Sequence, residues 1–229
     1  MIIAIHTSRK GSVGVVGKNT LMVGERPLYQ YGLRACAECV SIEGTLVATD
    51  IPEVLDFAAS LGLIPLSLSP ELANGNHYHT IRHAAEQAMA LYDVSIFVIV
   101  LGNALGATPD TLENAIARLL DNEVLDSVSS VSSFPMFNPL RAYVDRDGLL
   151  LPQVPSREIV VSGSVNERSA VETPWFFNGS FWVIRREVLF ANAGAPPFPW
   201  LGRRISAFHQ RPVMELDEPW QIPLMQTFL

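Results

Sequence analysis

A glycine-rich run near the amino terminus combines backbone freedom with positive charge. Residues 8–19 read Ser-Arg-Lys-Gly-Ser-Val-Gly-Val-Val-Gly-Lys-Asn and follow a short apolar stretch, 2–6. Glycines let backbone N–H groups approach an anion closely, and Arg9, Lys10 and Lys18 add charge, so the run suits a phosphate. It lacks the G-K-[ST] ending of a Walker loop and the G-x-G-x-x-G spacing of a dinucleotide site. Because glycines and lysines also make ordinary turns, both interpretations stay open.

An acidic pair near the carboxyl terminus has the spacing of a cation site. One residue separates Glu215 from Asp217, so in an extended segment both side chains project to the same side. Two carboxylates placed in this way can share one Mg²⁺, which prefers oxygen ligands. Taken alone, the pair favours a solvated position on the surface.

Two other groups of metal-binding residue types have weaker grounds. His79 and His83 are spaced i, i+4 in an expected helix and could ligate zinc, but the glutamate of H-E-x-x-H is absent. We favour polar residues that line a cleft or an interface. Cys36 and Cys39 have no second pair at zinc-site spacing, and we favour two small helix residues over a redox pair.

Alternating apolar strands and amphipathic helices must position these groups. Some of the strands are apolar throughout, which is typical of a mostly parallel sheet covered on both faces, and therefore of an α/β fold. We expect strands at 2–6, 44–49, 61–66, 94–101 and 126–133, and helices at 27–42, 76–92, from Asp50, which we expect to cap its helix, and from Thr108.

The region 135–175 differs from the rest in character. It is rich in prolines and carries strand-like pieces at 141–144 and 158–162, which indicates a β-rich arm outside the sheet. The chain returns to the sheet through 178–184, before a short helix that follows Arg185. We expect residues 1–229 to form a single domain from which this arm protrudes.

Composition excludes several classes of protein. The 229 residues are 48% hydrophobic and 17% charged, which predicts a sizeable buried core rather than disorder. A net charge of −7 argues against nucleic-acid or anionic-lipid partners. The amino terminus does not resemble a signal peptide, and no apolar stretch approaches the length of a membrane span. We expect a soluble, cytoplasmic protein.

The glycine-rich run resembles the signature R-x-G-S-K-x-x-x-x-K-N of the CMP-sugar synthetases. These cytidylyltransferases activate N-acetylneuraminic acid, Kdo and related acidic nonulosonic sugars. Further family landmarks follow in the same order along the chain. The matching positions are Arg9, Gly11, Ser12, Gly14, Lys18 and Asn19, then Pro27-Leu28, Ala48-Thr49-Asp50, Thr108-Pro109-Asp110, Asp126-Ser127-Val128, Asn138-Pro139-Leu140-Arg141-Ala142, Asn178-Gly179-Ser180 and Glu215-Leu216-Asp217.

The resemblance implies a fold, a reaction and an assembly. The fold is a Rossmann-like sheet of the nucleotide-diphospho-sugar transferase type, with an arm that is exchanged across a homodimer. In the implied reaction a sugar hydroxyl attacks the α-phosphate of CTP with Mg²⁺, CMP passes to an acidic, N-acetylneuraminate-like sugar, and pyrophosphate leaves. The reaction chiefly requires positioning and charge neutralisation.

The resemblance also assigns roles to individual residues. Arg9, Lys18 and Asp217 are the implied catalytic group. Arg141 would pair with the sugar carboxylate and Asn178 would hydrogen-bond the sugar, although a surface arginine on the arm is an equally open interpretation. The remaining implied residues are Arg9, Gly11, Ser12, Gly14, Lys18, Asn19 and Asn103 for the nucleotide, Glu215, Asp217 and Asn103 for the metal, and Phe177 (with Phe176 and Phe181 in an apolar wall), Tyr78 and His77 for the sugar. For the three phenylalanines we favour core or dimer contacts over the apolar wall.

Three positions depart from the family pattern. Val13 stands where the family has a lysine, Leu101 where it has a glutamine, and Asn103 where the Kdo branch has a metal-binding aspartate. A working cytidylyltransferase is our first hypothesis. A catalytically impaired protein that binds a nucleotide or a sugar, and a transferase that uses another nucleoside triphosphate, are the alternatives.

Overall fold

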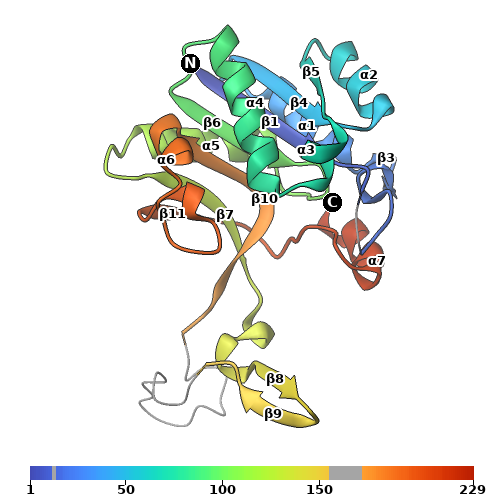
Figure 1. The fold of residues 1–229 in the computed structure, drawn as a ribbon, viewed down its shortest axis with the longest axis vertical. Helices are drawn as coiled ribbons and strands as arrows, with labels where there is room; N and C mark the ends of the chain where they lie inside the picture. The colour runs from blue at the N-terminus through green and yellow to red at the C-terminus, as the bar shows by residue number, and fades with distance from the viewer. Residues whose placement is uncertain (12–13, 155–171) are drawn as a thin grey trace.

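A seven-stranded sheet forms the centre of the molecule (Figure 1). The computed structural model describes residues 1–11, 14–154 and 172–229. The strand order is β11-β7-β10-β6-β1-β4-β5, and β10 is antiparallel to both of its neighbours while the other pairs are parallel. The expectation of a mostly parallel sheet is therefore confirmed. The strands are β1 (Ile2–Ser8), β4 (Gly44–Thr49), β5 (Ile64–Ser67), β6 (Ile96–Leu101), β7 (Ser127–Ser133), β10 (Trp175–Arg185) and β11 (Ile205–His209).

Helices cover both faces of this sheet. On one face, α4 packs against alternate residues of the central strands, such as Ile3 and Ile5, and on the other α1 and α5 pack against Ala4 and Val98. The described residues contain no helix long and apolar enough to cross a membrane. The helices are α1 (Tyr29–Glu38), α2 (Pro52–Ser60), α3 (Pro70–Asn74), α4 (His77–Leu91), α5 (Pro109–Leu120), α6 (Arg186–Ala191) and α7 (Ile222–Met225), with short 3₁₀ turns at Lys18–Thr20, Pro135–Phe137, Pro139–Arg141, Pro199–Leu201, Pro219–Gln221 and Gln226–Phe228.

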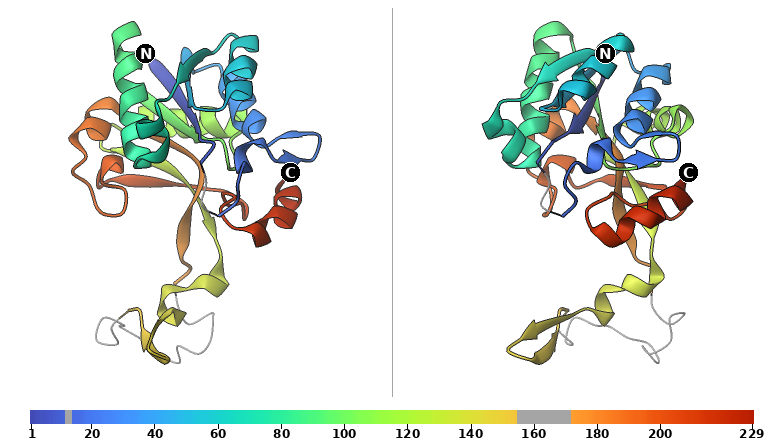
Figure 2. Two further views of the ribbon diagram at one scale, coloured as in Figure 1. Left: turned by 45° about the vertical axis from the view of Figure 1, so that its right-hand side comes forward. Right: turned by 90° about the vertical axis from the view of Figure 1, so that its right-hand side faces the viewer.

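An arm leaves the carboxyl edge of the sheet, as all views in Figures 1 and 2 show. It carries the hairpin of β8 (Tyr143–Arg146) and β9 (Leu149–Pro152). The strand expected at 158–162 lies outside the described residues. A second small hairpin, β2 (Met22–Val23) with β3 (Arg26–Pro27), follows the glycine-rich run.

Helix starts show where local signals held and where they did not. Thr108 and Thr111 form a reciprocal capping box that begins α5. The prediction that Asp50 caps α2 is wrong, because Ile51 is the N-cap and Asp50 Oδ1 instead accepts the N–H of Lys10 at 2.7 Å. Asp50 therefore anchors the beginning of the glycine-rich run.

Cys36 is a buried side chain of α1, Cys39 is the buried residue that caps its carboxyl end, and both are free thiols. Burial raises the pKa of Cys36, and burial together with the Glu113 carboxylate raises the pKa of Cys39 to about 12. Since the thiolate is the reactive form, these environments oppose a redox role.

A buried histidine in β1 makes folding stability depend on pH. Burial lowers the pKa of His6 to about 3, with a weaker opposing effect of the Tyr29 backbone. Below the ordinary histidine range, near 6.5, the unfolded chain binds a proton at this position that the folded chain does not, so stability falls as pH falls. Between pH 7 and pH 5, we expect the free energy of unfolding to fall by about 2 kcal/mol less in His6→Leu than in the wild type. Urea unfolding at both pH values measures this, and equal losses in the two proteins would contradict it.

Candidate functional site

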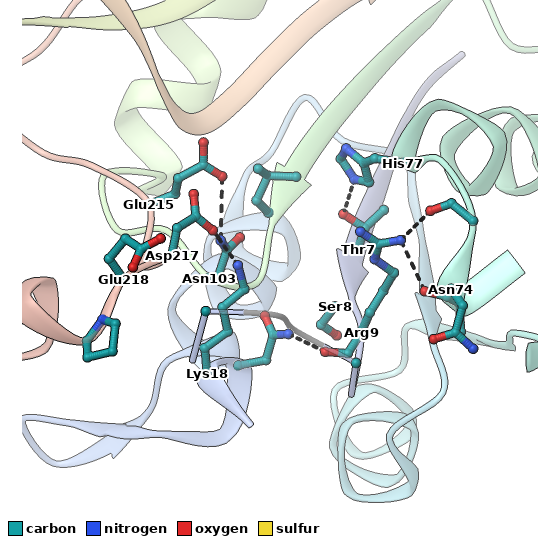
Figure 3. A pocket seen from close by; sticks show the side chains of 17 residues that line it. Thr7, Ser8, Arg9, Lys18, Asn74, His77, Asn103, Glu215, Asp217 and Glu218 are labelled. Carbon is teal, nitrogen blue, oxygen red and sulfur yellow. Dashed lines mark hydrogen bonds and ion pairs between the residues drawn. The ribbon is translucent and has the colours of Figure 1, made fainter. Parts of the chain in front are cut away.

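A cavity of about 1010 Å³ opens at the carboxyl ends of β1 and β6 (Figure 3). This edge is where α/β folds bind ligands, and the volume is at the upper end of small-molecule sites. The glycine-rich run, the loop after β6, the α3–α4 junction and the acidic segment 215–219 meet there. The described lining residues are Thr7, Ser8, Arg9, Gly11, Gly14, Lys18, Asn19, Ala73, Asn74, Gly75, His77, Leu101, Asn103, Glu215, Asp217, Glu218 and Pro219.

The acidic segment is joined to the loop that follows β6. Ala104 and Glu215 form an isolated antiparallel bridge, and the Leu216 N–H donates to Asn103 O at 2.7 Å. Leu216 is fully buried in an apolar cluster. Because the segment is extended, the residues on either side of Leu216 face the cavity, as the i, i+2 spacing predicts.

A bulge in β10 supports the segment from behind. The pairing of β10 with β7 shifts between Phe177 and Trp182, and within this shift Gly179 has φ +74°. A Cβ atom at Gly179 would lie 3.0 Å from the Glu215 side chain. Glycine is therefore required here by its backbone conformation and by the approach of Glu215.

The glycine-rich run lies directly against the acidic segment. A Cβ atom at Gly14 would lie only 1.9 Å from the backbone oxygen of Asp217, so only glycine permits this contact. Lys18 Nζ donates to Asp217 Oδ1 at 2.5 Å (Figure 3). The two groups of residues singled out at opposite ends of the chain therefore form one site.

Asn19 and Asn103 have buried amides that hold backbone and carboxylates in place. Asn19 Nδ2 donates to Arg9 O at 2.7 Å and closes the base of the run. Asn103 Nδ2 faces Leu216 O at 3.2 Å and the carboxylates of Asp217 and Glu215 at 3.4 and 3.5 Å. The amide nitrogen, rather than the oxygen, therefore faces these carboxylates and acts as a donor to them. The role of Asn103 as a metal ligand stays a prediction.

Burial and like charge act together on Glu215. Its pKa is raised by burial and by the neighbouring Asp217 carboxylate, and Lys18 and Asn103 oppose the shift. The half-exposed Asp217 pairs with Lys18, whereas Glu215 has the weaker contact to Asn103. The acidic segment thus carries more negative charge than Lys18 neutralises, and such an environment favours the binding of a metal cation.

The opposite wall of the cavity is polar and fixed by hydrogen bonds. One Arg9 guanidinium nitrogen donates to Gly75 O at 2.7 Å and to Ala73 O at 3.1 Å. His77 Nε2 and Thr7 Oγ1 are hydrogen-bonded at 2.9 Å. Burial, with the charges of Arg9 and Lys18, lowers the pKa of His77 to about 4, so the imidazole is neutral at pH 7.

The predicted nucleotide and metal residues come together, except that Ser12, like Val13, lies outside the described residues. Sequence analysis missed Ala73, Asn74 and Gly75, because the five-residue helix α3 has little periodicity to reveal it. It also missed Glu218, which continues the acidic pair. Within the described part of the chain, no group of three or more His, Cys, Asp or Glu side chains could hold a metal ion. His79 and His83 therefore do not belong to such a group.

Apart from His77, the predicted sugar residues lie outside this cavity lining. Asn178 is buried, accepts from Ser130 Oγ, and donates to Ser132 Oγ and Gln210 Oε1, so it belongs to a structural network and the prediction that it binds the sugar is not supported. Phe181 is a fully buried core residue rather than part of an apolar wall.

Two other members of that group remain near the surface. Phe177 packs on Phe198, and Tyr78 lies parallel to Trp200, with its hydroxyl donating to Leu189 O. They form an aromatic cluster with Trp182 next to the start of α4, the helix that also supplies His77. Arg141 lies in the 3₁₀ turn of the arm.

Comparison with known proteins agrees with this geometry. A family model described as cytidylyltransferase matches residues 3–140. The N-acylneuraminate cytidylyltransferase of Escherichia coli O18:K1:H7 (strain RS218 / NMEC) is 35% identical over 85 residues, which cover 36% of this chain and 20% of that protein. The 3-deoxy-manno-octulosonate cytidylyltransferase of Acaryochloris marina (strain MBIC 11017) is 26% identical over 122 residues, 53% of this chain and 48% of that protein. The matches thus span less than half the length of either relative.

Solved structures show the same fold. A CMP:2-keto-3-deoxy-manno-octonic acid synthetase complexed with CTP has a TM-score of 0.69 at 16% identity, covering 99% of this chain and 97% of the other. A 4-diphosphocytidyl-2C-methyl-D-erythritol synthase from Anaerococcus prevotii DSM 20548 has a TM-score of 0.63 at 11% identity, covering 99% and 95%. These likenesses confirm the expected fold of the nucleotidyltransferase type. With the family match over most of the sheet, they lead to one conclusion: the chain belongs to the cytidylyltransferase family, as a divergent relative of the CMP-sugar synthetases.

Proposed function

We propose that this protein transfers CMP from CTP to an acidic nonulosonic sugar of the N-acetylneuraminate kind, releases pyrophosphate and uses Mg²⁺. One observation carries the proposal. The contact of Lys18 with Asp217 brings the glycine-rich run and the acidic segment to the same cavity wall. Family membership supports the nucleotide, and the acidic sugar rests on the resemblance of the chain to CMP-sugar synthetases.

The residues of the cavity fit the demands of phosphoryl transfer. A sugar hydroxyl attacks the α-phosphorus, a new oxygen–phosphorus bond forms, and pyrophosphate departs with the electrons of the broken bond. Lys18 and Arg9 line the cavity and would neutralise the phosphates, and backbone N–H groups around Gly11 and Gly14 would approach them closely. Ser8 also lines the cavity, and its buried hydroxyl lacks a hydrogen-bond partner among the described residues. A bound ligand could supply that partner.

The acidic segment has the donor set that Mg²⁺ prefers. Glu215 and Asp217 offer hard carboxylate oxygens. Burial and the neighbouring Asp217 carboxylate raise the pKa of Glu215, and a divalent cation would stabilise its charged form. Bound there, Mg²⁺ would supply positive charge to the phosphates. Lys18, now paired with Asp217, would then be released to contact a phosphate as well. Each carboxylate and the lysine thus has a defined task.

The arm supports a homodimer. Leu149 and Leu150 in β9 are 68% and 67% exposed, and every residue of β8 and β9 is exposed. An isolated two-stranded hairpin is marginal in water, so it needs a covering surface. A second copy of the chain is the occupant that the family resemblance implies. In such a dimer Arg141 of the arm would be available to the sugar carboxylate.

Pyrophosphate release tests the activity. The protein is incubated with Mg²⁺, each of the four nucleoside triphosphates and a panel of acidic sugars, and we expect turnover with CTP. Asp217→Asn should lower kcat/KM roughly 100-fold, which corresponds to about 3 kcal/mol of lost charge stabilisation. Asp110→Asn changes an exposed aspartate of α5 and should leave the rate unchanged. No turnover with any pair would contradict the proposal, and turnover with another nucleotide would replace CTP in it.

The pKa of Glu215 predicts how activity depends on pH. Because this pKa is raised, Glu215 keeps its proton above the ordinary glutamate range, and activity should rise with pH as the proton leaves. Mg²⁺ competes with that proton, so a higher Mg²⁺ concentration should move the rising limb to lower pH. Rates measured across pH at two Mg²⁺ concentrations check this. If the rising limb of the pH–rate profile stays at the same pH at both Mg²⁺ concentrations, Glu215 is not a Mg²⁺ ligand.

Light scattering tests the assembly. A charge at Leu149, in Leu149→Asp, should be tolerated by the single chain and should convert a dimer into a monomer, since it desolvates a carboxylate in the interface. Leu120→Asp changes an exposed leucine of α5, away from the arm, and serves as the matched control. A wild-type protein of monomer mass, or a variant that remains a dimer, would contradict the proposed interface.

A further inference from the structure

A glutamine behind the acidic segment holds the part of the chain that carries Asp217. Gln221 closes the 3₁₀ turn Pro219–Gln221 and is only 9% exposed. Its Oε1 accepts the N–H of Asp217 and the N–H of Glu218, both at 2.7 Å, and its Nε2 donates to Met214 Sδ at 3.2 Å. The side chain does not line the cavity.

The orientation of this amide follows from its partners. Both backbone groups are donors, so the atom that faces them must be the oxygen. A capping box at Glu218 accounts for one of the two bonds. The second bond reaches back to Asp217 and is not needed to begin the turn. Two consecutive N–H groups that converge on one oxygen restrict the backbone of Asp217.

The segment is gripped from its other side as well. The Leu216 N–H and carbonyl are bonded to Asn103, and the side chain of Leu216 is buried. Asp217 therefore lies between a fixed residue before it and a fixed turn after it. Its side chain leaves this backbone toward Lys18 (Figure 3).

We propose that Gln221 is a positioning residue that aims the Asp217 carboxylate into the cavity. It acts through the backbone and touches neither phosphate nor metal. The inference has two consequences, of which the first stands on the geometry alone and the second rests on the proposed function. The first is that Gln221 maintains the pairing of Asp217 with Lys18. The second is that it sets the affinity of the acidic segment for a divalent cation.

Three variants separate positioning from mere support. Gln221→Met keeps the length of the side chain and removes the acceptor. Gln221→Glu keeps an oxygen that accepts both N–H groups. Gln210→Met is the matched control, because the Gln210 side chain also makes two hydrogen bonds, to Asn178 and to Gly106 O, in a structural network that includes neither Asp217 nor Lys18. Melting temperatures give the general cost of each change.

Acetylation of lysine in metal-free protein measures the first consequence. The chain contains only two lysines, Lys10 and Lys18, so Lys10, which is exposed, serves as the internal standard. We expect the labelling rate of Lys18 relative to Lys10 to rise several-fold in Gln221→Met and to remain at the wild-type value in Gln221→Glu and Gln210→Met. A wild-type labelling ratio in a folded Gln221→Met protein would overturn the inference.

Binding of Mn²⁺, as a spectroscopic substitute for Mg²⁺, measures the second consequence. Residues that orient metal ligands typically change metal affinity by about 10- to 100-fold when they are removed. We expect a loss of that size in Gln221→Met, less than about 3-fold in Gln221→Glu, and no change in Gln210→Met. An unchanged affinity in Gln221→Met would refute this consequence.

The two measurements fail in different ways. If the wild type binds no Mn²⁺ and releases no pyrophosphate, the proposed function is wrong, and the labelling ratio still decides whether Gln221 positions Asp217. If the wild type turns over CTP and the labelling ratio does not move, the function stands and the role of Gln221 is wrong.

Discussion

The common direction of β1 and β6 is the constraint on which the site depends. These strands are parallel neighbours at the centre of the sheet, so the loops that follow them emerge at one edge. The loop after β1 is the glycine-rich run, and the loop after β6 pairs with the acidic segment through Ala104 and Glu215. Reversal of either strand would separate Lys18 from Asp217 by the length of the sheet. The direction of the two strands brings these loops together, and the hydrogen bonds of Asn19, Asn103 and Gln221 then fix their positions in detail.

Much of the fold is readable in the sequence because burial on both faces leaves a continuous apolar run. The strand expected at 44–49 is found with those bounds, and the helix expected at 76–92 is α4, one residue shorter at each end. The hidden elements lack such a signal. β11 is half-exposed at the sheet edge, and β10 gives no sign of its reversed direction, since an antiparallel strand buried between two neighbours has the same apolar composition as a parallel one. The pairing of β11 and the direction of β10 therefore depend on contacts between distant parts of the chain, not on the local sequence.

The same distinction explains which of the predicted residues lie together at the cavity. The glycines and the acidic pair act through spacing and backbone geometry, which a sequence displays directly. Asn103 and Asn178 are identified from the sequence only as amides, and the direction in which an amide points depends on partners distant along the chain. Asp50 is likewise a residue type that often caps helices, yet its carboxylate accepts the N–H of Lys10 and not one from the first turn of α2. Side-chain direction, rather than residue type, is therefore what the sequence lacked.

The large sequence separation between Lys18 and Asp217 has a consequence for how the site forms during synthesis and folding. The two residues are 199 positions apart, so the chain between them must be synthesised and its sheet assembled before they can meet. A nascent chain that has emerged only as far as α5 already holds the glycine-rich run, but it has no acidic partner for it. Ligand binding would then begin late, after the last strand has joined. Recovery of nucleotide binding during refolding would consequently report completion of the entire domain rather than of its first half.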